Sequence, residues 1–102
     1  ALITVGNLVM DPNKHEVLLR GEKIDLTPLE FQILEELLRS VGKVVKRADL
    51  AIHLMENGYT GSEATLKIHI RNIRLKLGDD LDKPKFIETV FGIGYRFLEE
   101  GG

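Results

Sequence analysis

The first 26 residues alternate short apolar runs with turn signals, a pattern typical of paired strands. Gly6-Asn7 separates the apolar runs at 2–5 and 8–10, and such two-residue loops are typical of β-hairpins. Asp11-Pro12-Asn13 suits a type I turn, and Gly21 separates two further short runs at 16–20 and 23–26. The pattern therefore predicts a four-stranded antiparallel sheet over residues 1–26.

From residue 27 onward the apolar spacing changes to that of helices. Thr27, Pro28 and Glu30 mark a helix start, because Thr can cap, Pro needs no partner in the first turn, and Glu can close a capping box. Gly42 is the predicted end of this helix. Its apolar positions recur at helical spacing and are Leu29, Phe31, Ile33, Leu34, Leu37 and Leu38. A second helix is predicted over about residues 47–56, with apolar positions Leu50, Ile52, Leu54 and Met55.

A third helix is predicted from about Ser62 to Gly78, where glycine is the expected C-terminal residue. Its apolar stripe is spaced four, three and four residues apart and consists of Leu66, Ile70, Ile73 and Leu77. Residues 86–90 and 95–98 then read as two strands, with Gly92 and Gly94 allowing the bend between them. The expected architecture is α+β: a sheet, three helices over residues 27–78, and a terminal hairpin over residues 86–98.

Composition narrows the class of protein. The chain has 102 residues, 43% of them hydrophobic and 29% charged, which fits one globular domain. No apolar run approaches the ~20 residues that a bilayer crossing needs, and no membrane association is expected. With no cysteine, the sequence offers neither disulfides nor a thiol nucleophile. The ends at Ala1 and Gly102 suggest a fragment of a longer protein.

The charge is segregated along the chain although the net charge is only −2. Residues 64–78, which make up most of the third helix, contain four basic residues and no acidic one, whereas the segments before and after contain more acids than bases. A helix with a cationic face can enter the DNA major groove, where Lys or Arg can bind guanine, Asn72 can pair with adenine, and Ile68 can touch a thymine methyl group. The alternative is an ordinary solvated helix face.

Enzymatic sites are not indicated. His15, His53 and His69 lie on three separate predicted elements without metal-ligand spacing. Ser40 and Ser62 lack the glycines of a nucleophile elbow. The acidic pairs at 35–36 and 79–80 are interpreted as solvated surface. We therefore expect no enzymatic activity, no metal and no cofactor.

Three motifs occur in the order and at the spacing of a known family: residues 26–31 (LTPLEF), 68–74 (IHIRNIR) and 89–97 (TVFGIGYRF). Together they resemble the OmpR/PhoB family, specifically the winged-helix effector domain of bacterial two-component response regulators. The similarity covers nearly the whole chain. The resemblance implies a winged helix-turn-helix that binds promoter DNA and regulates transcription. The receiver domain that usually precedes such an effector, and that is phosphorylated on Asp, is absent from this chain.

The resemblance also implies site residues. Base-reading positions fall on Lys67, Ile68 and Asn72. Phosphate-contacting positions fall on Thr65, His69, Arg71 and Arg74, to which the charge of Lys76 is added. Residues 89–94 form the wing, which places Thr89, Phe91, Gly92 and Gly94 at the minor groove. If three to five phosphates are neutralised, log affinity should fall with log salt with a slope of about −3 to −4.5.

A loop contact with RNA polymerase is implied as well, through Glu56, Asn57, Gly58, Tyr59, Thr60 and Gly61. Tyr59 is the candidate exposed anchor of this loop, with packing against the helices as the alternative. Phe91 stands where the family often has Arg; it either wedges against DNA or packs within the hairpin. Met55, Ala64, Lys67 and Leu75 also depart from the family pattern.

The expected partners are double-stranded promoter DNA and RNA polymerase. Homodimers on tandem half-sites are expected for the full-length protein, with the isolated domain monomeric, in the bacterial cytoplasm. Two alternatives remain open at this point. One is a winged helix used for protein contacts, and the other is the DNA-binding domain of a membrane-linked one-component regulator.

Overall fold

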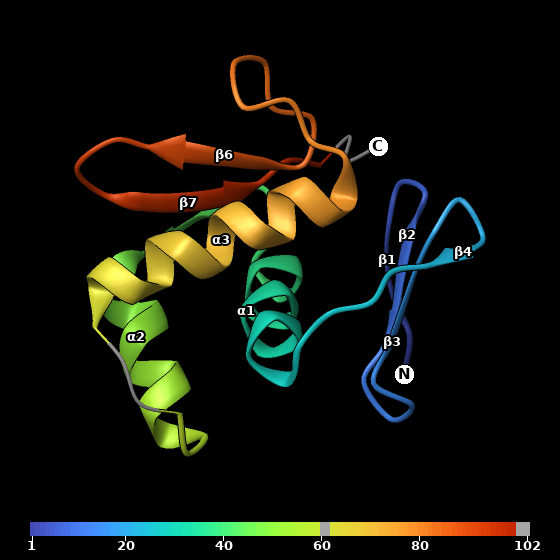
Figure 1. The fold of residues 1–102 in the computed structure, drawn as a ribbon, viewed down its shortest axis with the longest axis horizontal. Helices are drawn as coiled ribbons and strands as arrows, with labels where there is room; N and C mark the ends of the chain where they lie inside the picture. Colours follow the sequence, from blue (N-terminus) through green and yellow to red (C-terminus); the bar gives the residue numbers. More distant parts are fainter. Residues whose placement is uncertain (60–61, 100–102) are drawn as a thin grey trace.

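The computed structural model describes residues 1–59 and 62–99 and places two antiparallel sheets around a core of three helices (Figure 1). The N-terminal sheet pairs its strands in chain order, as the sequence predicts. Its strands are β1 (Ile3–Val5), β2 (Leu8–Asp11), β3 (Glu16–Leu19) and β4 (Glu22–Lys23). In Figure 1 this sheet stands beside α1 (Pro28–Arg39), at the opposite end of the molecule from the tip of the C-terminal hairpin.

The three predicted helices are confirmed. The start of α1 is the expected capping box: the Glu30 N–H donates to Thr27 Oγ1 at 3.2 Å, and the Thr27 N–H donates to Glu30 Oε1 at 3.0 Å. Helix α1 ends earlier than predicted, at Arg39, and Gly42 instead occupies the turn that follows, with a φ of +80°. Helix α2 (Arg47–Glu56) and helix α3 (Glu63–Leu77) lie within the ranges that the sequence predicts.

The predicted C-terminal hairpin is confirmed, and it belongs to a three-stranded sheet whose third strand the sequence did not indicate. Strands β6 (Ile87–Val90) and β7 (Gly94–Phe97) pair as expected, but β7 also pairs with β5 (Val44–Lys46), giving the order β5-β7-β6. In sequence β5 is only three residues, too short for an alternating pattern to stand out. Lys46, which precedes α2, pairs with Gly94 beside the turn of the wing, so β5 holds the wing next to the start of α2.

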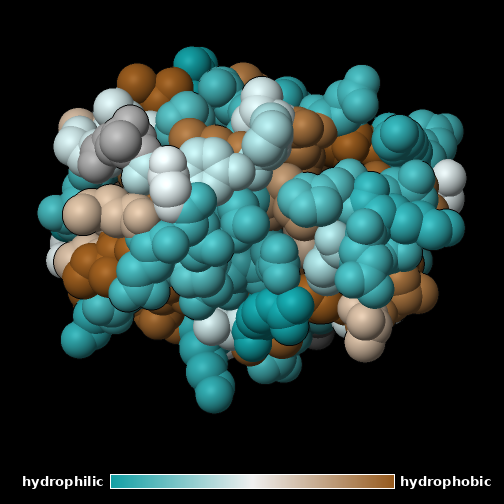
Figure 2. All heavy atoms as spheres, turned by 90° about the horizontal axis from the view of Figure 1, so that it is seen from below, coloured by the Kyte–Doolittle hydropathy of each residue, from teal (hydrophilic) through white to brown (hydrophobic). Residues whose placement is uncertain are grey.

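Side chains from both sheets and all three described helices form one buried cluster, in which the four apolar residues of the α3 stripe are at most 3% exposed. None of the described helices has the length and apolar character needed to cross a bilayer. Seen from below, the surface is mostly hydrophilic with separate apolar spots (Figure 2). The apolar stripe of α3 is therefore buried in the core, which leaves the opposite side of this helix available for a partner.

Gly94 is required by the close approach of two strands. A Cβ atom at this position would meet the carbonyl oxygen of Val45 and the backbone of Lys46 in β5. A Cβ atom at Gly92 would meet no neighbouring atom, so the only cost of alanine there is the left-handed backbone conformation, with a φ of +77°. Gly92→Ala should lower the free energy of unfolding by about 1–2 kcal/mol. We expect Gly94→Ala to lower the melting temperature much more than Gly92→Ala does, because its Cβ would collide with β5. Equal melting temperatures for the two variants would contradict the seating of β7 on β5.

Candidate nucleic-acid interface

Helix α3 is well defined at both ends. Ser62 and Thr65 form a reciprocal capping arrangement, in which the Thr65 N–H donates to Ser62 Oγ and the Ser62 N–H donates to Thr65 Oγ1. Gly78 ends the helix in the left-handed conformation, with a φ of +72°. A helix fixed in this way presents its exposed residues at set positions.

The exposed side of α3 carries most of the predicted base-reading residues. Lys67, Arg71 and Ile68 are exposed, Ile68 to 60%, and Asn72 is half-buried. Leu75 is 54% exposed on the same face as Ile68, seven residues later. The outer face of α3 therefore combines cations, one amide and two apolar side chains, and no other described segment covers it.

Arg74 does not share this exposure. It is only 7% exposed, and its guanidinium contacts three parts of the chain. Nε lies 3.6 Å from Asp79 Oδ2, Nη1 donates to Thr89 Oγ1 at 3.3 Å, and Nη2 lies 3.5 Å from the carbonyl oxygens of Asp80 and Leu81. Arg74 thus connects α3 to the following loop and to strand β6 of the wing.

The Asp79 carboxylate completes this connection. It accepts hydrogen bonds from three successive backbone N–H groups at the start of β6: Lys85 at 2.7 Å, Phe86 at 3.3 Å and Ile87 at 3.0 Å. A buried carboxylate is tolerated where a cation and several donors satisfy it. We call Arg74, Asp79 and Thr89 the wing strut, because these three residues fix the wing relative to α3.

Lys76 points to a different part of the molecule. Its Nζ lies 2.6 Å from Oε1 of Glu30, the buried capping residue of α1. Lys76 follows Lys67 by nine residues, which places the two side chains on opposite sides of the helix. The geometry therefore argues against the predicted phosphate contact at Lys76, whose charge is balanced within the fold.

This pair makes stability depend on pH. Burial alone would raise the pKa of Glu30, but hydrogen bonds from Lys76 and Thr27, with the charge of Lys76, hold that pKa below its ordinary value of 4.5. Because folding lowers the pKa of Glu30, its ionised carboxylate stabilises the folded state at pH values above the ordinary pKa. This stabilisation is lost as the pH falls through the lowered pKa.

We expect the free energy of unfolding to fall on acidification through this range. Glu30→Gln should remove the pH-dependent part of this free energy, because Gln carries no charge. The capping box should remain, since it accepts Gln at this position. Denaturant melts of both proteins from neutral pH to about pH 3 check this, because the stability difference between them should shrink as pH falls. A difference that stays constant over that range would contradict the assignment.

A groove separates α3 from the wing. It has a volume of about 220 Å³ and is lined by Lys67, Ile70, Arg71, Arg74, Leu81, Thr89, Phe91 and Tyr95. Exposed cations of α3 stand on one side of it and the wing tip on the other. Of the predicted wing residues, Thr89 belongs to the wing strut, Gly92 forms the turn and Gly94 contacts β5.

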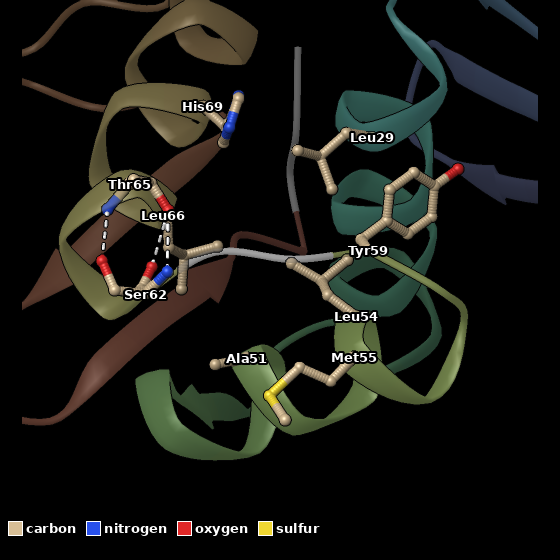
Figure 3. A pocket seen from close by; sticks show the side chains of 9 residues that line it. All are labelled: Leu29, Ala51, Leu54, Met55, Tyr59, Ser62, Thr65, Leu66 and His69. Carbon is tan, nitrogen blue, oxygen red and sulfur yellow. Dashed lines mark hydrogen bonds between the residues drawn. The ribbon is translucent and has the colours of Figure 1, made fainter.

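The remaining predicted contacts lie near the start of α3. Thr65 and the half-buried His69 line a small cavity of about 20 Å³ between α1, α2 and α3, together with Tyr59 (Figure 3). Tyr59 is half-buried against the core and its N–H donates to the Leu54 carbonyl, which favours the packed alternative over an exposed anchor. Glu56, Asn57 and Gly58 are exposed, while Thr60 and Gly61 lie outside the described residues.

Titratable side chains show no arrangement for metal binding in the part of the chain that the structure describes. His53 Nε2 of α2 lies 3.3 Å from Glu36 Oε2 of α1. His15 stacks on Phe31, with ring centroids 4.6 Å apart. Both histidines therefore connect elements of the fold.

Sequence reasoning missed the wing strut and the Lys76–Glu30 pair. The only available signals were an acid immediately after the basic helix and an acid in a capping box, and both have ordinary local explanations. Long-range ion pairs of this kind depend on the tertiary packing of α3 against α1 and β6.

The helices α1, α2 and α3, followed by a hairpin beside α3, define a winged helix-turn-helix. Comparison with known proteins agrees. The profile of a family described as "Transcriptional regulatory protein, C terminal" matches residues 21–97. The chain belongs to this family, and its neighbours are OmpR/PhoB-type effector domains.

Among curated relatives, the regulatory protein VanR of Enterococcus faecium is 38% identical over 97 residues, which cover 93% of this chain and 42% of VanR. The transcriptional regulatory protein BaeR of Escherichia coli is 38% identical over 91 residues, which cover 88% of this chain and 38% of BaeR. The chain thus spans about two fifths of the length of these relatives.

Solved structures show the same fold. The RstA DNA-binding domain of Klebsiella pneumoniae, crystallised with the RstA box, has a TM-score of 0.87 at 33% identity, over 96% of this chain and 97% of that one. The DNA-binding domain of CpxR from Escherichia coli has a TM-score of 0.82 at 30% identity, over 98% of each chain.

Proposed function

We propose that this chain binds double-stranded DNA by inserting α3 into the major groove and setting the wing at the adjacent minor groove. The observation that carries the proposal is the outer face of α3, which is exposed, carries Lys67 and Arg71, and lies beside a wing whose position is fixed. A domain of similar fold has been crystallised on its DNA box, which supports this mode of binding. The function is sequence-specific regulation of transcription as the effector domain of a response regulator.

Contacts with DNA divide into reading and positioning. Lys67, Ile68 and Asn72 read base edges, which is the role that the family resemblance gives to their positions, and their side chains suit contacts with bases in the major groove. Phosphate contacts come from Arg71 and from Thr65 and His69 near the start of α3. Arg74, also predicted as a phosphate contact, is instead buried against Asp79 at the groove and positions the wing relative to α3.

The experiment is a fluorescence-anisotropy titration against random-sequence duplexes over about 50–200 mM salt. Because Lys76 is paired with Glu30 and Arg74 with Asp79, we expect only two or three phosphates to be neutralised. The slope of log affinity against log salt should then be about −2 to −3, shallower than the charge of the sequence suggests. A slope near zero, or no binding, would overturn the proposal and favour a winged helix used for protein contacts.

We further propose two protein partners, RNA polymerase and a second copy of the full-length protein, and a location in the bacterial cytoplasm. RNA polymerase contacts the loop at 56–61, where Glu56 and Asn57 are exposed. In the full-length protein, two copies bind tandem half-sites about one helical turn apart (~34–36 Å). The isolated chain acts as a monomer in the cytoplasm of a bacterium and catalyses no reaction.

A further inference from the structure

The wing tip is apolar and unusually exposed. Phe91 is 90% exposed, more than any other large hydrophobic side chain of residues 1–59 and 62–99, and Ile93 is 50% exposed. Phe91 therefore does not pack within the hairpin, which was one of its two predicted roles. Phe91 and Ile93 together make the tip apolar, and both side chains are open to contact with a partner.

The tip has no cation with which to bind phosphate. Over residues 86–98 the only basic side chain is Arg96, and its Nη1 lies 3.1 Å from Glu88 across the hairpin. The hairpin itself therefore offers no unpaired cation with which to attract DNA at its tip. The contact that its side chains can make is apolar.

The turn at the tip is also tied directly to the rest of the fold. The Ile93 N–H closes the turn on the Val90 carbonyl at 3.0 Å, and the Ile93 carbonyl accepts from the Arg47 N–H at 3.2 Å, which ties the turn to α2. Gly94 rests on β5, and Arg74 holds Thr89. A side chain on a supported turn can push against a base stack without the turn folding away.

The groove between α3 and the wing sets where the tip lies on DNA. Lys67 and Arg71 line one side of it and Phe91 the other. If one sugar–phosphate strand lies in this groove, α3 occupies the major groove on one side of the strand. Phe91 then reaches the minor groove on the other side, where inserted apolar side chains are a known means of unstacking bases.

We infer that Phe91 inserts between two base pairs in the minor groove, partly unstacks them and bends the duplex. This inference rests on the proposed function and adds a determinant of specificity to it. Unstacking is easiest at pyrimidine–purine steps such as TA and CA. Phe91 therefore selects a flexible step at a position where no side chain reads the bases by hydrogen bonds.

The test uses the 102-residue chain and a duplex selected by it from a random pool. 2-Aminopurine replaces the adenine of the flexible step nearest the wing, and dyes at the duplex ends report bending. We expect binding of the unmodified chain to increase both 2-aminopurine fluorescence and energy transfer. Phe91→Ala should abolish both changes and bind about tenfold more weakly. Ile52→Ala, at an exposed apolar residue of α2, is the matched control and should change neither signal.

Phe91→Arg separates insertion from affinity. We expect this variant to regain binding through charge, with a salt slope steeper by about one, but without the fluorescence increase. Thermal melting of Phe91→Ala should match the unmodified chain, because the ring is exposed.

Three results would overturn the inference. If the unmodified chain binds the duplex without either signal, Phe91 does not insert between base pairs, although the chain binds DNA. If Phe91→Ala loses affinity only on duplexes with two half-sites, Phe91 contacts a second copy of the chain instead. If the unmodified chain binds no duplex at low salt, the proposed DNA binding is wrong, and the insertion of Phe91 is wrong with it.

Discussion

Asp79→Ala is expected to lower the free energy of unfolding by about 3–5 kcal/mol, the usual cost of removing one partner from a buried ion pair. The substitution leaves the guanidinium of Arg74 buried without its counter-charge and removes the acceptor of three backbone N–H groups at the start of β6. Few single substitutions in a domain of this size have so large an effect. Chemical denaturation followed by circular dichroism measures it.

Asp82→Ala is the matched control, because Asp82 is an exposed acid in the same loop. Its effect should stay within about 0.5 kcal/mol, as for most surface substitutions. If Asp79→Ala were no more destabilising than Asp82→Ala, the wing strut would not hold the wing, and the fixed geometry on which the DNA contacts depend would lose its support.

Asn72→Ala and Arg71→Ala are expected to weaken DNA binding in different ways. Asn72→Ala should cost about 1–3 kcal/mol on the preferred duplex and relax the preference at one base pair, because an amide reading a base edge is lost. Arg71→Ala should weaken binding to all sequences alike and reduce the salt slope by about one. Selection from a random duplex pool, followed by anisotropy titrations, distinguishes the two patterns.

Lys23→Ala is the control for these variants. Lys23 is an exposed cation of β4, on the N-terminal sheet and away from α3 (Figure 1). Its removal should leave affinity and preference nearly unchanged. If Asn72→Ala and Arg71→Ala merely reduced every affinity by the same factor, the assignment of reading and positioning roles would be wrong.

Local rules account for the parts of the fold that the sequence predicts well. The capping box at Thr27, the helix start near Ser62 and the terminal Gly78 depend on residues within one helical turn, so the sequence pattern is enough to predict them. The apolar stripe of α3 depends only on helical period. These signals were sufficient to place the helix whose opposite face forms the candidate site.

Long-range pairing accounts for what the sequence did not predict. Strand β5 is short and becomes a strand only because β7, about fifty residues later, pairs with it. The sequence predicts a DNA contact for each of the four basic residues of the third helix, yet packing pairs Lys76 with Glu30 and Arg74 with Asp79. Sequence gives the sign of a charge, whereas only the fold shows which charges remain free for a partner.

The central claim is that the outer face of α3 and the wing form the DNA interface. Titrating the ¹⁵N-labelled chain with a duplex and following backbone amide shifts by NMR tests it most directly. We expect the largest changes along residues 65–75 and 89–93, with little change in the N-terminal sheet. Changes concentrated in β1–β4, with α3 and the wing unaffected, would contradict the account.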